Sequence, residues 1–354
     1  MTIPKYPPIV ASPATEHPFH PLAEFVSSDR PWLIHQCDVL DGLRALPDQC
    51  IQTVVTSPPY WALRDYGVAG QLGLEATPAE YIRNMVAVFS DVRRVLRNDG
   101  TLWLNIGDSY AGSGKGPTGH NGIGDQEQRQ GFSTSKGARI GSINGESGHT
   151  SGVTPPPGLK PKDLVGIPWM LAFALRDAGW YLRQDIIWSK PNPMPESVTD
   201  CCTKAHEYIF LLSKSRTYFY DSDAVREEGA GRTDLWNLQI AARLTDGTPD
   251  PGRWDKTEKE PNGRNRRSVW EIATEPYPEA HFATYPSGLV EPCIKAGSRE
   301  GDLILDPFCG SGTTPMVALR LGRRALGFEL NESYVDLGRR RVVGDAPLFN
   351  GETS

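Results

Sequence analysis

The stretch LILDPFCGSGTT, residues 303–314, decides the fold of this chain. It is typical of a buried strand that ends in a tight glycine turn and leads into a helix. The expected helix ends at Gly322, and a second strand at 324–328 ends in Glu329. Such a βαβ unit binds nucleotides, because glycines let a ligand approach the backbone and an acid about 20 residues on binds ribose hydroxyls. Pro315 stands where the dinucleotide pattern has its third glycine, which disfavours a dehydrogenase.

A second motif, TSPPYW at 56–61, follows the β-branched run IQTVVT at 51–56. The run predicts a buried strand, and two prolines end a strand abruptly because neither can donate to the ladder and both have a fixed φ. The motif therefore offers a hydroxyl, a stiff backbone with free carbonyls and aromatic rings at one strand end. This suits the binding of a flat heterocycle by its amino group. A plain Pro-Pro turn with a surface tyrosine is the alternative interpretation.

Taken together, the two motifs resemble those of a known family. DPFCGSGTT with Glu329 is similar to the S-adenosylmethionine motifs of DNA amino-methyltransferases, and TSPPYW is similar to their catalytic motif. The catalytic motif comes first in this chain, which resembles the permuted β arrangement of that family. WSKPNPMP at 188–195 with HEYIF at 206–210, and HFATYP at 281–286, also resemble family segments. The resemblance covers about 32–110, 160–220 and 280–342.

The organisation of the chain follows from alternating strands and helices, which predict an α/β fold: a mostly parallel sheet with helices on both faces. The resemblance implies a Rossmann-like methyltransferase sheet with permuted motif order. We expect an irregular N-terminal segment at 1–28, a catalytic half at 29–220 and an S-adenosylmethionine-binding half at 281–345. Residues 221–280 are expected to form an irregular target-recognition insertion. The Gly-rich stretch 107–158 is either a mobile loop that closes over DNA or a passive linker.

The individual elements have clear signals. A helix is expected from Pro78 to about Arg97, with Thr77 as N-cap, Glu80 completing a capping box and Gly100 as the stop. Other expected strands lie at 32–36, 101–106, 182–188 and 208–212, with helices at 43–46, at 168–176 and, more weakly, at 235–244. GSGK at 112–115 lacks the spacing and the Ser or Thr of a phosphate-binding loop, so we reject a Walker site.

The chemistry of an exocyclic amine explains the catalytic motif. Its lone pair is delocalised into the ring, so acceptors that take its two hydrogens can align the lone pair with a sulfonium methyl group. Ser57 Oγ and the Pro58 carbonyl are the expected acceptors, and Tyr60 is expected to stack on a base that has left the duplex. The expected catalytic residues are Ser57, Pro58, Pro59 and Tyr60. Trp61 and Trp188 are expected as pocket walls and Lys190 as a substrate or DNA contact.

The resemblance also assigns the cofactor side. Asp306 would face the methionyl amino group, Phe308 would pack near the cofactor and Glu329 would hold the ribose hydroxyls. The remaining expected cofactor residues are Pro307, Gly310, Gly312 and Thr313. Asp38 either reaches the adenine edge or is an ordinary turn aspartate.

Several alternatives concern the target. In this family a first-position serine is associated more often with N4 of cytosine, and Asp or Asn with N6 of adenine, so cytosine-N4 is favoured. A serine hydroxyl could also donate to the cytosine ring nitrogen. Methylation at cytosine carbon-5 needs a thiolate, and Pro292-Cys293 lies before the cofactor strand instead of at a substrate strand end. A catalytically silent S-adenosylmethionine- and DNA-binding regulator and an RNA methyltransferase remain competing hypotheses.

The composition of the chain limits the partners that it can be expected to bind. A formal net charge of −6 argues against a generally basic nucleic-acid-binding surface, but basic residues gather between 253 and 267. This segment is either a solvated loop or a contact with double-stranded DNA through Arg253, Arg264, Arg266 and Arg267. No cysteine pair has zinc spacing, so we expect no metal. The sequence shows no targeting signal and no membrane span, which predicts a cytoplasmic protein. Whether the chain forms a homodimer or accompanies a cognate restriction endonuclease is left open.

Overall fold

The computed structural model of the 354-residue chain describes residues 21–111, 155–194, 199–227, 264–275 and 284–345. The expected helix at 235–244 and Arg253 lie outside these residues, as does most of the Gly-rich stretch. No helix in the described part of the chain is long and apolar enough to cross a bilayer.

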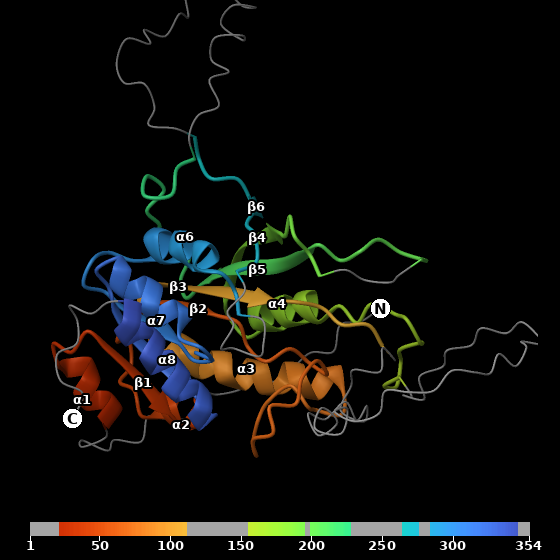
Figure 1. The fold of residues 1–354 in the computed structure, drawn as a ribbon, viewed down its shortest axis with the longest axis horizontal. Coiled ribbons are helices and arrows are strands. Elements are labelled where there is room, and N and C mark those ends of the chain that lie inside the picture. Colours follow the sequence, from red (N-terminus) through yellow and green to blue (C-terminus); the bar gives the residue numbers. More distant parts are fainter. Residues whose placement is uncertain (1–20, 112–154, 195–198, 228–263, 276–283, 346–354) are drawn as a thin grey trace, which may run out of the picture.

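An eight-stranded sheet forms the centre of the molecule (Figure 1). Its order is β1 (Trp32–Gln36), β8 (Arg324–Glu329), β7 (Leu303–Asp306), β2 (Ile51–Thr56), β3 (Leu96–Ile106), β5 (His206–Ser213), β4 (Tyr181–Ser189) and β6 (Val269–Glu271). Among these strands only β5 runs antiparallel to its neighbours. Strands from the first and last thirds of the chain therefore share one sheet, and the predicted, mostly parallel sheet is confirmed.

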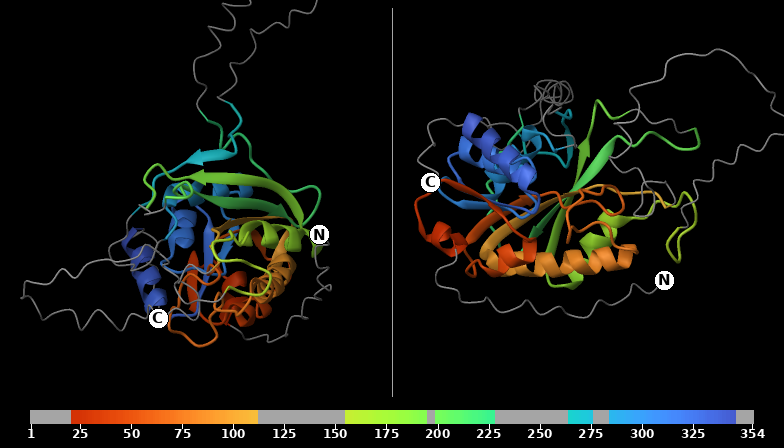
Figure 2. Two further views of the ribbon diagram at one scale, coloured as in Figure 1. Left: turned by 90° about the vertical axis from the view of Figure 1, so that its right-hand side faces the viewer. Right: turned by 60° about the horizontal axis from the view of Figure 1, so that its bottom comes forward.

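Helices cover both faces of the sheet, as predicted (Figure 2). On one face α1 (Pro21–Ser27), α2 (Val39–Arg44), α3 (Pro78–Val95) and α4 (Ile167–Asp177) contribute to one large apolar cluster. On the other face α6 (Ser287–Gly297), α7 (Thr313–Arg320) and α8 (Glu332–Asp345) contribute to a second cluster. Because both faces are buried, β2 and β7 have no exposed residues along their length, which is typical of central parallel strands.

Helix α3 shows where sequence signals were right and where one was wrong. The capping box is present: Thr77 accepts from the Glu80 N–H, and the Glu80 side chain accepts from the Thr77 N–H. The predicted stop at Gly100 is wrong, because the helix ends at Val95 and Leu96 already begins β3. A Cβ on Gly100 would lie 2.8 Å from the Gln52 carbonyl, so this glycine permits close strand packing and does not cap the helix.

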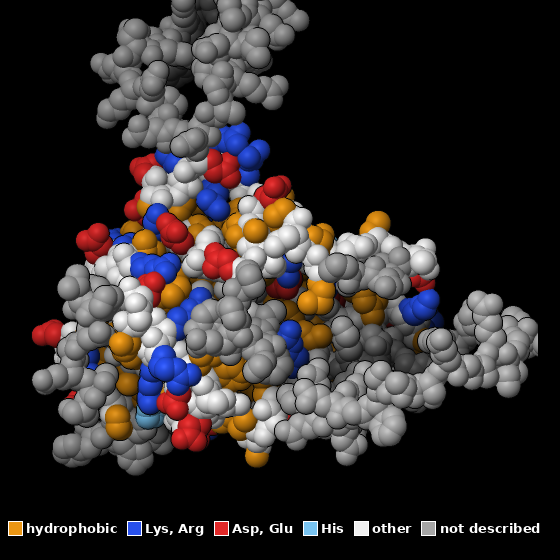
Figure 3. Space-filling view, viewed as in Figure 1, with side chains coloured by type: hydrophobic (Ala, Val, Ile, Leu, Met, Phe, Trp, Pro, Cys, Tyr) orange, Lys and Arg blue, Asp and Glu red, His pale blue; other side chains and the backbone are white. Residues whose placement is uncertain are grey.

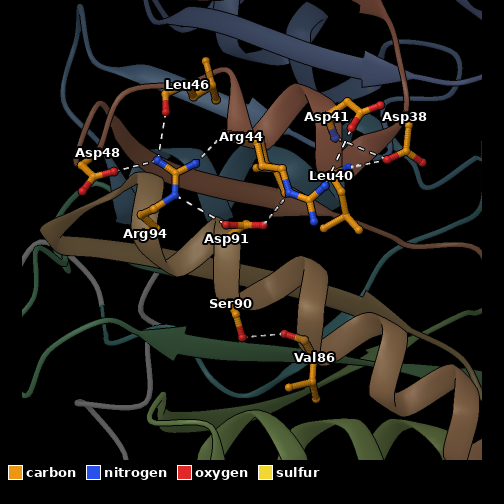
Figure 4. Close-up of polar contacts among 11 residues, drawn as sticks. Asp38, Leu40, Asp41, Arg44, Leu46, Asp48, Val86, Ser90, Asp91 and Arg94 are labelled. Atoms are coloured by element: carbon orange, nitrogen blue, oxygen red, sulfur yellow. Dashed lines mark hydrogen bonds and ion pairs between the residues drawn. The ribbon is translucent and has the colours of Figure 1, made fainter. Parts of the chain in front are cut away.

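A charged cluster joins α3 to α2 (Figure 4). Asp91 is only 3% exposed and lies 3.5 Å from Arg94 Nε and 3.9 Å from Arg44 Nε. Arg94 also donates to the carbonyls of Leu43 and Leu46 and pairs with the exposed Asp48 at 2.7 Å. A buried carboxylate needs such partners, so the cluster fixes the position of α2 against α3.

We predict that Asp91→Asn lowers the free energy of unfolding by roughly 2–4 kcal/mol, because it leaves the arginines without a buried counter-charge. Asp48→Asn is the matched control, since it removes an exposed partner of the same arginine and should cost less than about 1 kcal/mol. Urea unfolding followed by circular dichroism measures both. Equal losses in the two variants would contradict this account.

Candidate active site

The sequence motifs meet where the carboxyl ends of β7, β2 and β3 lie beside the amino end of β5, here called the strand-end edge. β2 pairs with β7 through Thr53–Ile304 and Val54–Leu305, so the TSPPYW and DPF motifs leave adjacent strands at the same edge. The antiparallel pairing of Ile106 with Tyr208 brings the start of β5 to this edge as well. The structure thus brings together segments that are far apart in the sequence.

A fully buried carboxylate, Asp306, lies at the centre of this edge. It accepts hydrogen bonds from Thr56 Oγ1 at 2.7 Å, the Tyr285 hydroxyl at 2.6 Å and the Phe308 N–H at 3.1 Å. Burial raises the pKa of Asp306, although hydrogen bonds from these partners act in the opposite direction. The carboxylate of Asp306 is thus surrounded by donors from the interior, and its expected contact with a methionyl amino group stays a prediction.

The catalytic motif turns its polar groups towards β3 and β5. The Tyr60 hydroxyl lies 2.6 Å from Glu207 Oε2 and 3.2 Å from Asn105 Oδ1, and Ser57 Oγ lies 3.3 Å from the Tyr60 hydroxyl. Glu207 Oε1 pairs with Lys190 Nζ at 2.5 Å. The expected catalytic residues Ser57 and Tyr60 and the expected contact Lys190 are thus linked through Glu207.

The two prolines and the ring of Tyr60 are tightly packed. Pro58 is buried, and the Pro59 carbonyl accepts a hydrogen bond from the Tyr81 hydroxyl of α3 at 2.9 Å. A Cβ on Gly107 would lie 2.7 Å from the Tyr60 ring, so only glycine fits behind it. The motif is therefore a rigid platform, as its sequence predicts.

The glycine turn after β7 has the conformation that a ligand-binding loop needs. Gly310 and Gly312 have φ values of +51° and +78°, and a Cβ on Gly310 would meet no atom within 4 Å. Pro307 and Thr313 are buried, with Thr313 Oγ1 accepting from Arg341 at 2.8 Å, and Phe308 is partly buried. Gly310 thus faces open space, whereas Pro307 and Thr313 support the loop from within.

Glu329 ends β8 beside this turn. Its carboxylate accepts from the Gly310 and Asn331 N–H groups, both at 2.9 Å. Burial raises its pKa, against the effect of these hydrogen bonds. Asp38 lies at the same edge, beyond the Gln36–Glu329 pair, and caps α2 by accepting from the Leu40 N–H at 2.9 Å. This hydrogen bond fits the interpretation of Asp38 as an ordinary turn aspartate.

The two tryptophans expected as pocket walls are almost completely buried. Trp61 and Trp188 are 4% and 3% exposed, and their indole N–H groups donate to the carbonyls of Glu75 and Ile272. They are buried because each packs against an apolar cluster of the interior. Trp188 is connected to the strand-end edge through Lys190, whose Nζ lies 4.3 Å from the centroid of the Trp188 ring.

Of the basic residues between 253 and 267, the structure describes Arg264, Arg266 and Arg267, which lie just before β6. Lys and Arg side chains gather at the top of the described part of the molecule in Figure 3. Arg264 and Arg267 both lie 3.0 Å from Glu227 Oε2, and Arg266 lies 4.5 Å from the Trp270 ring centroid. Two exposed arginines share one carboxylate, so this group keeps a net positive charge.

Cys293, the thiol considered for methylation at cytosine carbon-5, is not at a strand end. Cys293 lies buried within α6, its thiol donates to the Leu289 carbonyl at 3.3 Å, and burial raises its pKa. Burial thus disfavours the thiolate form of Cys293, which a nucleophile would need. Within the described ranges no group of three or more His, Cys, Asp or Glu is placed to hold a metal ion.

Sequence reasoning missed Glu207, Asn105, Tyr285 and Thr56. A signal existed for Glu207, because a charged residue at the start of the apolar strand YIFLL is unusual in a sheet centre. The other three gave no signal of their own, since their partners lie on other segments.

Comparison with known proteins identifies the family. The DNA methylase family matches residues 51–340, which is most of the chain. The chain belongs to this family of DNA methylases. This DNA methylase is 43% identical over 308 residues to the Type II methyltransferase M.Cfr9I of Citrobacter freundii, covering 87% of this chain and 86% of that protein. It is 44% identical to the Type II methyltransferase M.SmaI of Serratia marcescens, with coverages of 86% and 89%.

Solved structures share the fold of this methylase. The PvuII DNA methyltransferase (cytosine-N4-specific) has a TM-score of 0.56 at 18% identity, covering 91% of this chain and 94% of that one. A putative DNA modification methylase from Thermus thermophilus, complexed with S-adenosyl-L-methionine, has a TM-score of 0.53 at 22% identity, with coverages of 91% and 99%. The Rossmann-like methyltransferase fold implied by the motifs is confirmed.

We predict that Tyr285→Phe lowers the free energy of unfolding by about 1–3 kcal/mol, because Asp306 loses a donor while the ring is kept. Tyr181→Phe is the control, since Tyr181 is exposed and its change should stay within about 0.5 kcal/mol. Denaturant unfolding compares them. A Tyr285→Phe protein as stable as the control would show that Asp306 does not need this hydrogen bond.

The raised pKa of Glu329 predicts a pH dependence. The folded protein keeps this proton to a higher pH than the unfolded chain, so the contribution of Glu329 to stability falls as pH rises from about 4.5 through the raised pKa. Glu329→Gln removes this fall. The free energy of unfolding of the variant, relative to that of the wild type, should therefore increase as pH rises through this window. Glu300→Gln, at an exposed site, should show the wild-type pH dependence. A constant difference between Glu329→Gln and wild type would refute the prediction.

Proposed function

We propose that this DNA methylase transfers a methyl group from S-adenosylmethionine to the N4 amino group of cytosine in double-stranded DNA, after the base has left the duplex. The observation that carries the proposal is the position of Ser57 and Pro58 at the end of β2, beside the glycine turn after β7. An amine acceptor and a cofactor loop on adjacent parallel strands allow direct transfer between their ligands.

The residues at the strand-end edge fit the cofactor. Gly310 opens onto free space, and Glu329 lies at the end of β8 beside it, where ribose hydroxyls could replace or join its backbone contacts. Phe308 would pack against the cofactor, whereas Asp306 supports the loop from behind through the Phe308 N–H. When bound, S-adenosylmethionine supplies an electrophilic methyl group on a sulfonium.

The chain's own part in the reaction is to bind and orient the amine. Ser57 Oγ and the Pro58 carbonyl accept the two amino hydrogens, which draws the nitrogen lone pair out of conjugation with the ring. Pro58 and Pro59 keep these acceptors in place because the backbone there cannot relax. Tyr60 is partly exposed, and we propose that its ring stacks on the extruded base.

The choice of cytosine rests on Ser57, because serine at this position of the family is associated more often with cytosine-N4. Adenine-N6 is the second candidate, since the acceptors at the edge fit either amino group. The same relatives are named Type II methyltransferases, and this supports a cytoplasmic modification enzyme with a cognate restriction endonuclease for the same site. Arg264, Arg266 and Arg267 are proposed to contact the DNA phosphates.

Mass spectrometry of nucleosides from plasmid DNA exposed to the protein and S-adenosylmethionine tests the proposal, and N4-methylcytosine is the expected product. N6-methyladenine would overturn the choice of base and keep the rest. Methylation of RNA in preference to duplex DNA would overturn the substrate. Binding of both cofactor and DNA with no methylated product would favour a silent regulator.

We predict that Ser57→Ala slows methyl transfer on the order of 10²-fold, because an acceptor of the amine is lost. Ser90→Ala on α3 is the control, since the Ser90 hydroxyl donates to the Val86 carbonyl within its own helix, and this variant should keep the wild-type rate. Single-turnover rates with labelled cofactor measure the effect. A Ser57→Ala protein as fast as the control would remove Ser57 from the site.

A further inference from the structure

The contacts at the strand-end edge fix the direction in which the Tyr60 hydroxyl donates. Tyr60 has one hydroxyl proton, and its two acceptors are Glu207 Oε2 at 2.6 Å and Asn105 Oδ1 at 3.2 Å. The shorter contact is to the charged group, and hydrogen bonds to ionised acceptors are the stronger ones. The Tyr60 hydroxyl therefore donates its proton to a hydrogen bond with Glu207, and Tyr60 Oη can only accept from its other neighbours.

The hydrogen bond from Tyr60 to Glu207 determines the role of Ser57. Ser57 Oγ lies 3.3 Å from Tyr60 Oη, which has no proton to give, so Ser57 is the donor in this pair. The lone pairs of Ser57 Oγ are then all that it can offer to a ligand. A base amino group matches them, whereas a base carbonyl would place oxygen against oxygen.

Glu207 is itself held in place. Lys190 Nζ contacts its Oε1 at 2.5 Å, and Asn105 Nδ2 donates to its Oε2 at 3.1 Å. The side chains of Lys190 and Glu207 are only 19% and 16% exposed, so water screens this pair less than a surface pair. Burial, together with the nearby charge of Glu207, raises the pKa of Tyr60, which therefore keeps the proton that it donates.

We propose that Glu207 sets the hydrogen-bond polarity of the site: acting through Tyr60, it makes Ser57 an acceptor only, so that the site selects an exocyclic amine over a carbonyl. The inference rests on the proposed function and makes Glu207 a positioning residue, since it acts through Tyr60. It also means that Ser57 does not donate to the cytosine ring nitrogen, which removes one physical argument for cytosine over adenine. Discrimination arises because a mismatched carbonyl leaves polar groups unpaired.

The test compares single-turnover methylation of plasmid DNA by the wild type, Glu207→Gln, Tyr60→Phe and the double variant. Glutamine keeps the shape of Glu207, but its amide can donate to Tyr60 and so reverse the polarity. We expect each single variant to be about 10-fold slower or more, with dissociation constants for S-adenosylmethionine and DNA within about twofold of wild type. The double variant should be no slower than the slower single variant, because both changes remove the same polarity.

Two outcomes would overturn the inference: a Glu207→Gln rate within about twofold of wild type, or losses that multiply in the double variant, which indicate separate structural roles. Glu291→Gln breaks an exposed Glu–Lys pair of 2.6 Å on α6 and should keep the wild-type rate. If Glu207→Gln fails to bind the cofactor, Tyr60→Phe still decides, because it leaves the Glu207–Lys190 pair in place. A wild-type protein that methylates no DNA would instead refute the proposed function.

Discussion

The buried carboxylate of Asp306 is the interaction on which the site depends. A carboxylate without contact with water is tolerated only when donors surround it, so Thr56, Tyr285 and the Phe308 N–H must stay where they are. Thr314 extends the set, since its Oγ1 lies 2.5 Å from the Tyr285 hydroxyl and 3.2 Å from the Val55 carbonyl. Satisfying one buried charge thus holds the catalytic strand beside the cofactor turn, although their segments are distant in the sequence.

The sheet topology adds the second half of the site. β2, β3 and β7 run parallel and present their carboxyl ends together, which is where ligands bind in open α/β sheets. β5 runs the other way, so its first residues arrive at the same edge. Glu207 is therefore placed beside the catalytic motif by strand direction, and Lys190, just beyond the end of β4, supplies its counter-charge. Asp306 supports the edge from the β7 side and Glu207 from the β5 side.

Local signals predicted much of this fold. The strands at 32–36 and 51–56 have the predicted bounds, and Thr77 and Glu80 form the predicted capping box. These features depend on residues a few positions apart, so the sequence contains all the information that they need. Gly100 was misread because a glycine after a helix has two explanations, a stop or a close contact. Only the position of Gln52 on the neighbouring strand separates them.

The sequence by itself determined the motifs, their strand-and-turn conformations and the family to which they belong, because these are encoded in short runs with strict chemistry. Only the tertiary structure decided which polar group each motif residue meets. Asp306 faces inward, Trp61 and Trp188 are buried, and Glu207 joins the site. The physical reason is that burial and hydrogen-bond partners depend on strand order and direction, which bring residues together regardless of their separation along the chain.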